Sequence, residues 1–366
     1  MATTNAGSRI PPPGLVVPPV SLLVLAVALV VHPTGPGLVI VAAFLGAAVL
    51  SAVHHAEVVA HKVGEPFGSL VLAVAVTVIE VALIVTLMVS GGEDTSTLAR
   101  DTVFAAVMIT TNGIMGLSLL LTARRHHTAV FNPEGTGAAL ATVGTLSALC
   151  LVFPTFTTAR PGPEYSGAQL TFAAVASLLL YLLFVVTQTV RHRDFFLPVT
   201  DDGSPLEEQH AEPPSRSAAL LSLGMLLVSL VAVVGMAKVE SSAIEKGVSD
   251  LGLPQAFVGV VIALLVLLPE TIAAARAALL DRAQTSLNLA LGSAMASIGL
   301  TIPTIAVASI WLDGPLRLGL GPTQMVLLAL TIVVAVLTVV PGRATRLQGG
   351  VHLVLLAAFV FLSMAP

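Results

Sequence analysis

The chain has 366 residues, of which 56% are hydrophobic and only 10% are charged, and its net charge is −4 at pH 7. Soluble domains carry about 25% charged residues, so this composition excludes an ordinary soluble protein and indicates a polytopic membrane protein. Aromatic residues make up 4% of the chain and the net charge is negative, which excludes a nucleic-acid partner. The single cysteine, Cys150, allows no disulfide within the chain.

Apolar runs long enough to cross a bilayer follow one another along the whole chain. A helix rises about 1.5 Å per residue, so a run of about 20 apolar residues spans the hydrocarbon core. Bounding the runs by Gly, Pro and charged residues predicts eleven spans, at residues 15–31, 37–53, 67–90, 102–122, 137–157, 168–190, 217–237, 256–280, 286–310, 323–340 and 349–365. The sequence therefore predicts an all-α polytopic membrane protein.

The longest hydrophilic connection, residues 191–216, holds six carboxylates and three arginines, so it does not cross the membrane. Positively charged loops remain in the cytoplasm. Eleven of the sixteen Lys and Arg residues lie at the N-terminus or in the loops after the even-numbered spans. We therefore expect a multi-pass protein of the cell inner membrane, with the N-terminus and the acidic linker in the cytoplasm and the C-terminus outside.

The linker divides the remaining chain into one extra span and two sets of five. A unit of five spans reverses its direction when it is duplicated, which is the inverted-repeat design of many secondary transporters. We predict an N-terminal tail with the extra helix at residues 1–36, a first repeat at residues 37–190, the acidic linker at residues 191–216 and a second, inverted repeat at residues 217–366.

The two predicted repeats can be aligned on four residues. Setting Glu80 on Glu270 aligns the third span with the eighth, and setting Gly116 on Gly299 aligns the fourth with the ninth. Apolar helices resemble one another, so each match is weak alone. A duplication is favoured because three features agree with it, namely the topology, the position of the linker and the pair of glutamates.

Each predicted repeat has one ionisable residue in the middle of a span, Glu80 or Glu270. A carboxylate at that depth is costly in lipid and indicates a functional interior. Because the two spans enter from opposite sides, we expect the carboxylates to meet at the bilayer centre. Two carboxylates in one low-dielectric pocket repel, so at least one should hold a proton, and an arriving divalent cation would displace it. The alternative is that each glutamate is a neutral, hydrogen-bonded core residue.

Further oxygen ligands are predicted around the two glutamates. Pro269 frees the backbone carbonyl of Leu265 in mid-span, and freed carbonyls suit hard cations. The candidate neutral side chains at this depth are Thr77, Thr110, Asn112 and Ser293. A packing kink at Pro269 and the close helix approach that small residues allow are the alternative interpretations.

A polar cluster lies on one helical face at the cytoplasmic end of the second span, where His54, Glu57 and His61 follow one another at helical spacing. Imidazoles and a carboxylate at the mouth of a pathway favour a proton relay or a cation gate, and a solvated helix end is the alternative. A zinc site would indicate an intramembrane metalloenzyme. The spacing lacks a closed ligand set such as HExxH, which favours a transporter over an enzyme.

The segment that starts at His54, HHAEVVAHKVGEPFG, and runs on to TVIE at residues 77–80 resembles bacterial calcium/proton antiporters of the ChaA type in the cation/calcium exchanger superfamily. The sequence LPET at residues 268–271, with Gly292-Ser293, is similar to that superfamily's second repeat. The resemblance implies two inverted five-helix repeats after one extra helix, and alternating access by sliding of the peripheral helices. It also implies that Glu80 and Glu270 bind the cation and protons and that Glu57 is a gate-side acid.

The sequence thus predicts a secondary antiporter that exports Ca²⁺ in exchange for H⁺, with Na⁺ and K⁺ as further candidate cations and with no cofactor. The expected partners are inorganic cations and the lipid bilayer, and the oligomeric state is open. Two alternatives remain at this point. One is a sodium-coupled calcium exchanger, and the other is the metalloenzyme with zinc at His54, Glu57 and His61.

Overall fold

The computed structural model describes residues 13–64, 67–90, 96–199, 214–311 and 314–365. Ten helices in this part of the chain are long and apolar enough to cross a membrane, and the pair α10–α11, bent by 54°, makes an eleventh span. The predicted number of spans and the all-α class are confirmed, and the chain is a multi-pass membrane protein. Part of the predicted linker, residues 200–213, lies outside the described residues.

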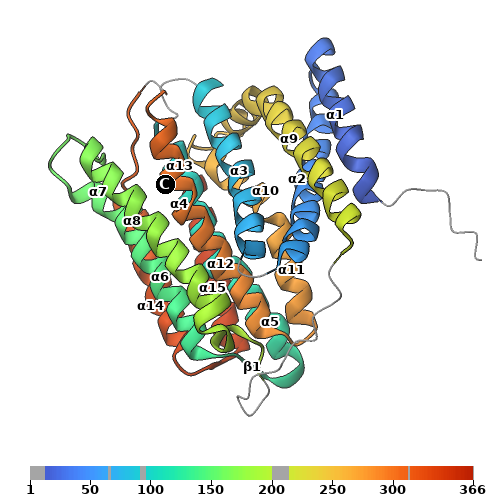
Figure 1. Cartoon of the computed structure of the whole chain (residues 1–366). Coiled ribbons are helices and arrows are strands. Elements are labelled where there is room, and N and C mark those ends of the chain that lie inside the picture. Colours follow the sequence, from blue (N-terminus) through green and yellow to red (C-terminus); the bar gives the residue numbers. More distant parts are fainter. Residues whose placement is uncertain (1–12, 65–66, 91–95, 200–213, 312–313, 366) are drawn as a thin grey trace, which may run out of the picture.

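The helices and helical turns follow one another along the chain in an order that Figure 1 colours from blue to red. They are α1 Pro13–Val31, α2 Pro36–Val63, α3 Phe67–Ser90, α4 Leu98–Met108, η2 Ile109–Ile114, α5 Met115–His126, α6 Pro133–Ser147, η3 Ala148–Val152, α7 Phe153–Phe156, α8 Gly167–Val186, η4 Thr187–Arg191, η5 Arg193–Phe196, α9 Arg216–Asp250, α10 Phe257–Val266, α11 Leu268–Leu279, α12 Ala283–Gly299, α13 Thr301–Ala308, α14 Pro322–Val339 and α15 Arg346–Met364.

Two short strands, which the sequence did not predict, join loops at the lower end of the molecule in Figure 1. β1, Thr128–Val130, pairs antiparallel with β2, Arg343–Thr345. β1 follows α5 and β2 precedes α15, so the ladder fixes the start of the last helix against the end of α5. We call this end of the bundle, where η4 and α9 flank the linker, the linker end.

The helices form two packed groups with α3 and α10 between them. On one side α1, α2 and α9 pack together around a first apolar cluster, and on the other side α4–α8 and α11–α15 surround a second. Side chains of α3 and α10 contribute to both clusters. Figure 1 shows the α1–α2–α9 group on the right and the larger group on the left. α3, which carries Glu80, and α10, which directly precedes the helix that carries Glu270, therefore lie where the two groups meet.

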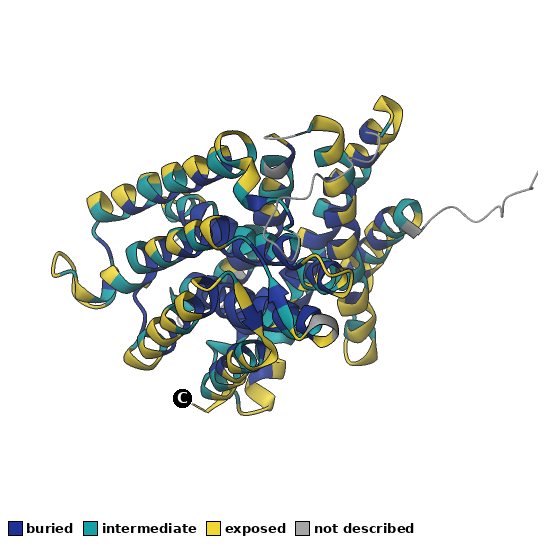
Figure 2. Ribbon diagram, turned by 90° about the horizontal axis from the view of Figure 1, so that it is seen from below, coloured by how far each residue is buried: buried dark blue, intermediate teal, exposed yellow. Residues whose placement is uncertain are grey.

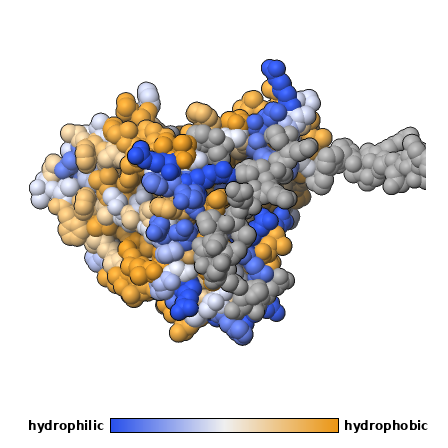
Figure 3. All heavy atoms as spheres, turned by 60° about the horizontal axis from the view of Figure 1, so that its bottom comes forward, coloured by the Kyte–Doolittle hydropathy of each residue, from blue (hydrophilic) through white to orange (hydrophobic). Residues whose placement is uncertain are grey.

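The outer surface of the bundle is apolar along its flanks. Large hydrophobic side chains are exposed on the outward faces of most helices, among them Leu23, Val39, Phe172, Leu183 and Val354. Figure 2 shows exposed residues on the outward faces and buried ones inside, and Figure 3 shows hydrophobic flanks around a more hydrophilic lower end. This pattern is what a protein surrounded by lipid requires, because apolar side chains there face hydrocarbon tails.

Two helices extend well beyond the lengths predicted for them. α2 continues from the predicted end at residue 53 to Val63, and α9 continues from residue 237 to Asp250, giving 35 residues. At about 1.5 Å per residue, α9 is far longer than the roughly 30 Å of hydrocarbon. Polar residues end an apolar run in the sequence but do not by themselves end a helix, and α2 and α9 pack against each other and against α3.

Candidate cation site

Glu80 lies in the middle of α3 and is almost fully buried, with 2% of its surface exposed. One carboxylate oxygen, Oε2, accepts hydrogen bonds from the hydroxyls of Ser297 and Thr301, each at 3.0 Å. The other oxygen, Oε1, is buried and has no hydrogen-bond partner in the described part of the chain. A buried polar atom without a partner is costly, so this oxygen requires a proton or a cation.

Glu270 lies in the first turn of α11, directly after the bend between α10 and α11. Its Oε2 atom is also buried without a hydrogen-bond partner among the residues that the structure describes. Pro269 stands at the start of α11, where the missing N–H of proline costs no helical hydrogen bond. The chain therefore ends one helix and starts another at this depth, and it places the carboxylate at the free N-terminal end of the new helix.

Glu270 lies near the two other acidic residues of the predicted pathway. The carboxylate of Glu270 interacts electrostatically with both Glu80 and Glu57. Glu57, which is on the exposed side of α2, also faces the charges of His54 and Arg276. Glu80 and Glu270 come from helices that enter the bundle from opposite ends, as the topology predicts. The structure therefore brings the two membrane-centre glutamates into one electrostatic site with Glu57 at its edge.

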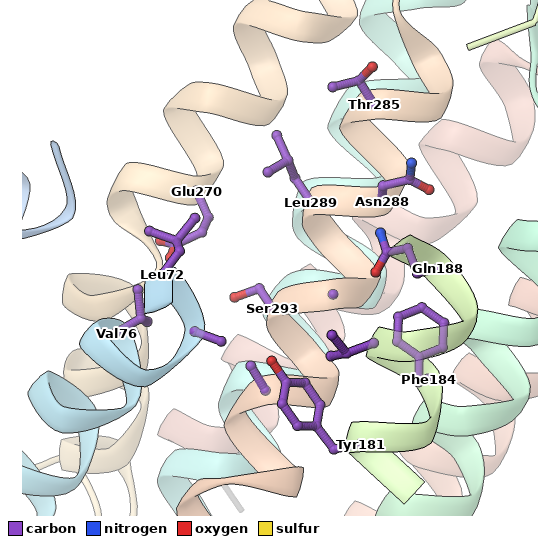
Figure 4. A pocket seen from close by; sticks show the side chains of 14 residues that line it. Leu72, Val76, Tyr181, Phe184, Gln188, Glu270, Thr285, Asn288, Leu289 and Ser293 are labelled. Atoms are coloured by element: carbon purple, nitrogen blue, oxygen red, sulfur yellow. The ribbon is translucent and has the colours of Figure 1, made fainter. Parts of the chain in front are cut away.

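A cavity of about 230 Å³ adjoins Glu270. Figure 4 shows Glu270 of α11 and Ser293 of α12 directed toward the same space, with Tyr181 and Gln188 on its other side. A water molecule takes about 30 Å³ in the liquid, so the cavity is large enough for a hydrated cation. Its lining is mostly apolar, with a few polar groups that converge, which is typical of a small-ligand site.

The cavity opens toward the linker end. Gln188 belongs to the last turn before the linker, and Thr285 and Asn288 belong to the first turns of α12. These three residues are partly exposed, whereas Glu80, farther along the pathway, is buried. The structure therefore shows one state of the molecule, with access to Glu270 from the linker end.

Ser297 and Thr301 are site residues that the sequence analysis did not select. They follow Ser293 at intervals of four residues, so the three hydroxyls line one face of the ninth span. That spacing was visible in the sequence and could have identified them. Ser293 lies beside Glu270 and the other two bind Glu80, so this single hydroxyl face of α12 and α13 contacts both halves of the site.

Asn112, a predicted ligand, is held by other helices in this structure, and its role as a ligand stays a prediction. Its Nδ2 donates a hydrogen bond to Oγ1 of Thr331 at 2.9 Å, and its Oδ1 lies 3.1 Å from Nδ1 of His352. Because Asn112 donates through Nδ2, its Oδ1 accepts from the imidazole. Both amide atoms are thus engaged by α14 and α15, and neither is free for a cation beside the glutamates.

Two of the predicted threonines are buried but do not line the cavity. The hydroxyl of Thr110 donates to the carbonyl oxygens of Ala106 and Val107 at 2.7 and 3.0 Å. Such bonds compete with regular helical pairing, and the helix widens to a π-helical turn, η2, at this point. Thr77 lies one turn before Glu80 and lines a separate groove between α3 and α13 with Thr304. Their roles as ligands stay predictions, as does that of the Leu265 carbonyl.

The cluster of His54, Glu57 and His61 lies in the last turns of α2, and all three side chains are exposed. Within the described residues no group of three or more His, Cys, Asp and Glu side chains is arranged to hold a metal ion. This finding contradicts the zinc alternative. The neighbouring His55 is buried instead, and its Nε2 donates to the carbonyl oxygen of Gly14, which ties α1 to α2.

Comparison with known proteins decides the family. Residues 35–190 and again residues 221–365 match the family described as "Sodium/calcium exchanger protein". The chain belongs to this family. It is therefore a cation exchanger of a bacterial-type antiporter family and not an enzyme.

Named relatives of this exchanger cover most of its length. A protein of Sinorhizobium fredii named as the ionic transporter y4hA is 48% identical over 89% of this chain and 88% of its own. The sodium-potassium/proton antiporter ChaA of Escherichia coli is 35% identical over 85% of this chain and 84% of its own. The crystal structure of the H⁺/Ca²⁺ exchanger CAX shares the fold, with a TM-score of 0.67 at 15% identity over 95% of this chain and 92% of that one.

Proposed function

We propose that this exchanger is an antiporter that exports Ca²⁺, and also Na⁺ and K⁺, in exchange for H⁺. The observation that carries the proposal is that Glu80 and Glu270 each have a buried carboxylate oxygen without a partner, in one electrostatic site beside an open cavity. Each unpartnered oxygen can take a proton or share a cation. The names of ChaA and CAX, which describe exchange of Na⁺, K⁺ or Ca²⁺ for protons, support the same assignment.

The proposed mechanism is competition for the two carboxylates. A cation that reaches Glu270 through the cavity meets the hydroxyl of Ser293 and the free carboxylate oxygen. Its charge favours the ionised carboxylates, so bound protons leave through the cavity. The hydroxyls of Ser297 and Thr301 already donate to Glu80 and hold its carboxylate for the cation. After the site has opened to the other side, protons displace the cation in the same way.

We further propose that the linker end faces the cytoplasm and that the protein acts in the cell inner membrane without a cofactor. The excess of Lys and Arg in the predicted loops at that end supports this orientation. The described state is then open to the cytoplasm, and the cavity beside Glu270 is the route by which the cation enters from the cell. The opposite side releases the cation and supplies the protons.

Ion flux into liposomes tests the proposal. Purified protein is reconstituted without Na⁺, a pH gradient is imposed, and uptake of Ca²⁺, Na⁺ or K⁺ is followed with radioactive tracers together with the internal pH. We expect cation uptake coupled to proton release, abolished by a protonophore. Calcium uptake that requires a sodium gradient and moves no protons would instead establish sodium-coupled exchange. The absence of any pH-driven cation flux would refute proton antiport.

A further inference from the structure

Two glycines mark equivalent helix crossings in the two predicted repeats. A Cβ atom on Gly299 of α12 would lie 2.6 Å from the Cβ of Tyr181, and one on Gly116 of α5 would lie 2.8 Å from the Cβ of His352. Only glycine allows either approach, because real Cβ contacts are longer. The alignment that sets Gly116 on Gly299 therefore also sets His352 of α15 on Tyr181 of α8, in agreement with the double match of the family to this chain.

This correspondence gives each residue that lines the open cavity on α3, α8 and η4 a counterpart in the other half of the chain. We call these counterparts the second set, and the residues that line the open cavity the first set. On α8 and η4 the cavity is lined by Tyr181, Phe184, Val185 and Gln188. The same spacing on α15 gives His352, Leu355, Leu356 and Phe359. On α3 the cavity is lined by Leu72, Ala73 and Val76, and the alignment of Glu80 with Glu270 gives Ile262, Ala263 and Val266 of α10. The counterpart of Glu270 itself is Glu80.

The α10 part of the second set is closed where the corresponding α3 part of the first set is open. Ile262, Ala263 and Val266 are all buried, whereas their counterparts Leu72 and Ala73 are partly exposed. His352 is fully buried, and its Nε2 lies 3.2 Å from Oγ1 of Thr338 while its Nδ1 faces Asn112. Equivalent residues of the two halves are thus packed differently, as expected for a transporter that is open on one side of the membrane.

An aromatic pair closes the second set at the end of the molecule opposite the linker. The rings of Phe104 in α4 and Phe359 in α15 meet edge to face, with centroids 5.5 Å apart and planes at 86°. Phe359 occupies the position that corresponds to Gln188, which stands at the open mouth of the cavity. Both rings are buried, and each is within two turns of the helix end that points away from the linker. The phenyl ring of Phe359 therefore stands where the open cavity has the amide of Gln188.

We propose that a second access cavity, closed in this state, lies between α4, α10, α15 and the second half of α3, and that the Phe104–Phe359 pair is its gate. The cavity leads from Glu80 to the side opposite the linker. It opens as the cavity beside Glu270 closes. The inference rests on the transport proposed above, and it adds where the second opening lies and which side chains seal it.

Cysteine accessibility tests the gate, because the chain has a single cysteine that is buried and can be replaced by Cys150→Ala. In that background Leu289→Cys places a thiol in the open cavity, and Ala106→Cys places one at the corresponding position of α4. A membrane-impermeant methanethiosulfonate reagent is applied to one side of sealed vesicles at a time. We expect Leu289→Cys to react from the linker side and Ala106→Cys from the opposite side.

Removal of the gate ring distinguishes the proposal from general loosening. Phe359→Ala should accelerate the reaction of Ala106→Cys at least tenfold from the side opposite the linker. The matched control Phe361→Ala removes a ring that is 66% exposed on the same helix and should leave the rate unchanged. The rate at Leu289→Cys, measured in each background, verifies folding. Phe104→Leu serves for the same comparison if Phe359→Ala does not fold.

Three results would overturn the gate. They are reaction of Ala106→Cys from the linker side, equal effects of Phe359→Ala and Phe361→Ala, and no reaction of Ala106→Cys from either side in a protein that exchanges cations. Ion flux through the protein without engineered cysteines is measured in parallel. Normal flux with one of these results refutes the gate alone, whereas absent flux refutes the proposed exchange.

Discussion

The carboxylate of Glu80 accepts a hydrogen bond from the hydroxyl of Ser297 at 3.0 Å, although the two residues are 217 positions apart in the chain. The glutamate of the first half is therefore held by a helix of the second half. Thr301, one turn later, makes the same contact with the same oxygen. The site is thus shared between the halves, and a change in how they pack also changes the surroundings of Glu80.

Loss of these two hydroxyls should weaken cation binding. A hydrogen bond to a charged group contributes about 1.5 kcal/mol or more, and about 1.4 kcal/mol is a tenfold change in affinity. Ser297→Ala should therefore raise the Ca²⁺ concentration that half-saturates transport about tenfold, and Thr301→Val should act in the same direction. Thr304→Val is the control, because the Thr304 hydroxyl is exposed and donates only to the carbonyl oxygen of Leu300. Equal effects of Thr301→Val and Thr304→Val would contradict the assignment.

Glu57 should govern cation capture rather than the exchange step. Its side chain is exposed at the end of α2 and interacts electrostatically with Glu270. Removal of a rim charge mainly slows association, and salt screens the effect. Glu57→Gln should raise the half-saturating Ca²⁺ concentration several-fold at low salt with little change in the maximal rate. Glu134 is an exposed acid at the start of α6, and Glu134→Gln should change neither value. Indistinguishable kinetics of the two variants would contradict a role of Glu57 in cation capture.

The contact of Asn112 with His352 should show as a coupling energy for stability. Either single change, Asn112→Ala or His352→Ala, leaves buried polar groups unpaired, at a cost of about 1–3 kcal/mol in the free energy of unfolding. The double variant should lose about 1 kcal/mol less than the sum of the two. Denaturant unfolding in detergent measures the cycle, with exposed His32→Ala as the control. Strict additivity would show that the contact contributes nothing.

The two close helix crossings should not tolerate a methyl group. Gly116→Ala and Gly299→Ala each force a Cβ against a neighbouring helix and should lower the free energy of unfolding by about 1–3 kcal/mol. Gly224→Ala on α9 meets no atom within 4 Å and should be neutral or stabilising by about 0.5–1 kcal/mol, since alanine favours a helix. Unfolding of all three variants under the same conditions provides the comparison. A stable Gly116→Ala protein would show that the crossing at His352 is looser than described.

Much of the fold could be predicted because it depends on length and charge. A lipid-spanning helix must be apolar for about 20 residues, so the eleven spans were visible one by one, and a glutamate in such a run is conspicuous. The ends of α2 and α9 could not be predicted in the same way. Polar residues such as Glu57 and Glu240 end an apolar run, but they do not by themselves end a helix, and both helices continue past them.

The partners of single side chains were harder to predict. Asn112 was expected beside the glutamates because its depth is right, but depth does not determine which neighbour a helix face meets. The position of His352 in the last span gave no sign that it would be that neighbour. Ser297 and Thr301 differ in this respect, because their spacing from Ser293 places all three hydroxyls on one helical face and is visible in the sequence.

The most direct test of the central claim is Ca²⁺ uptake driven by an imposed pH gradient in sodium-free liposomes that contain either the unchanged protein, Glu80→Gln or Glu270→Gln. The amide keeps the size of the carboxylate but removes its charge and its exchangeable proton. We predict robust uptake by the unchanged protein and none by either variant, with all three equally well folded. Substantial uptake by either variant would contradict a cation and proton site shared by Glu80 and Glu270.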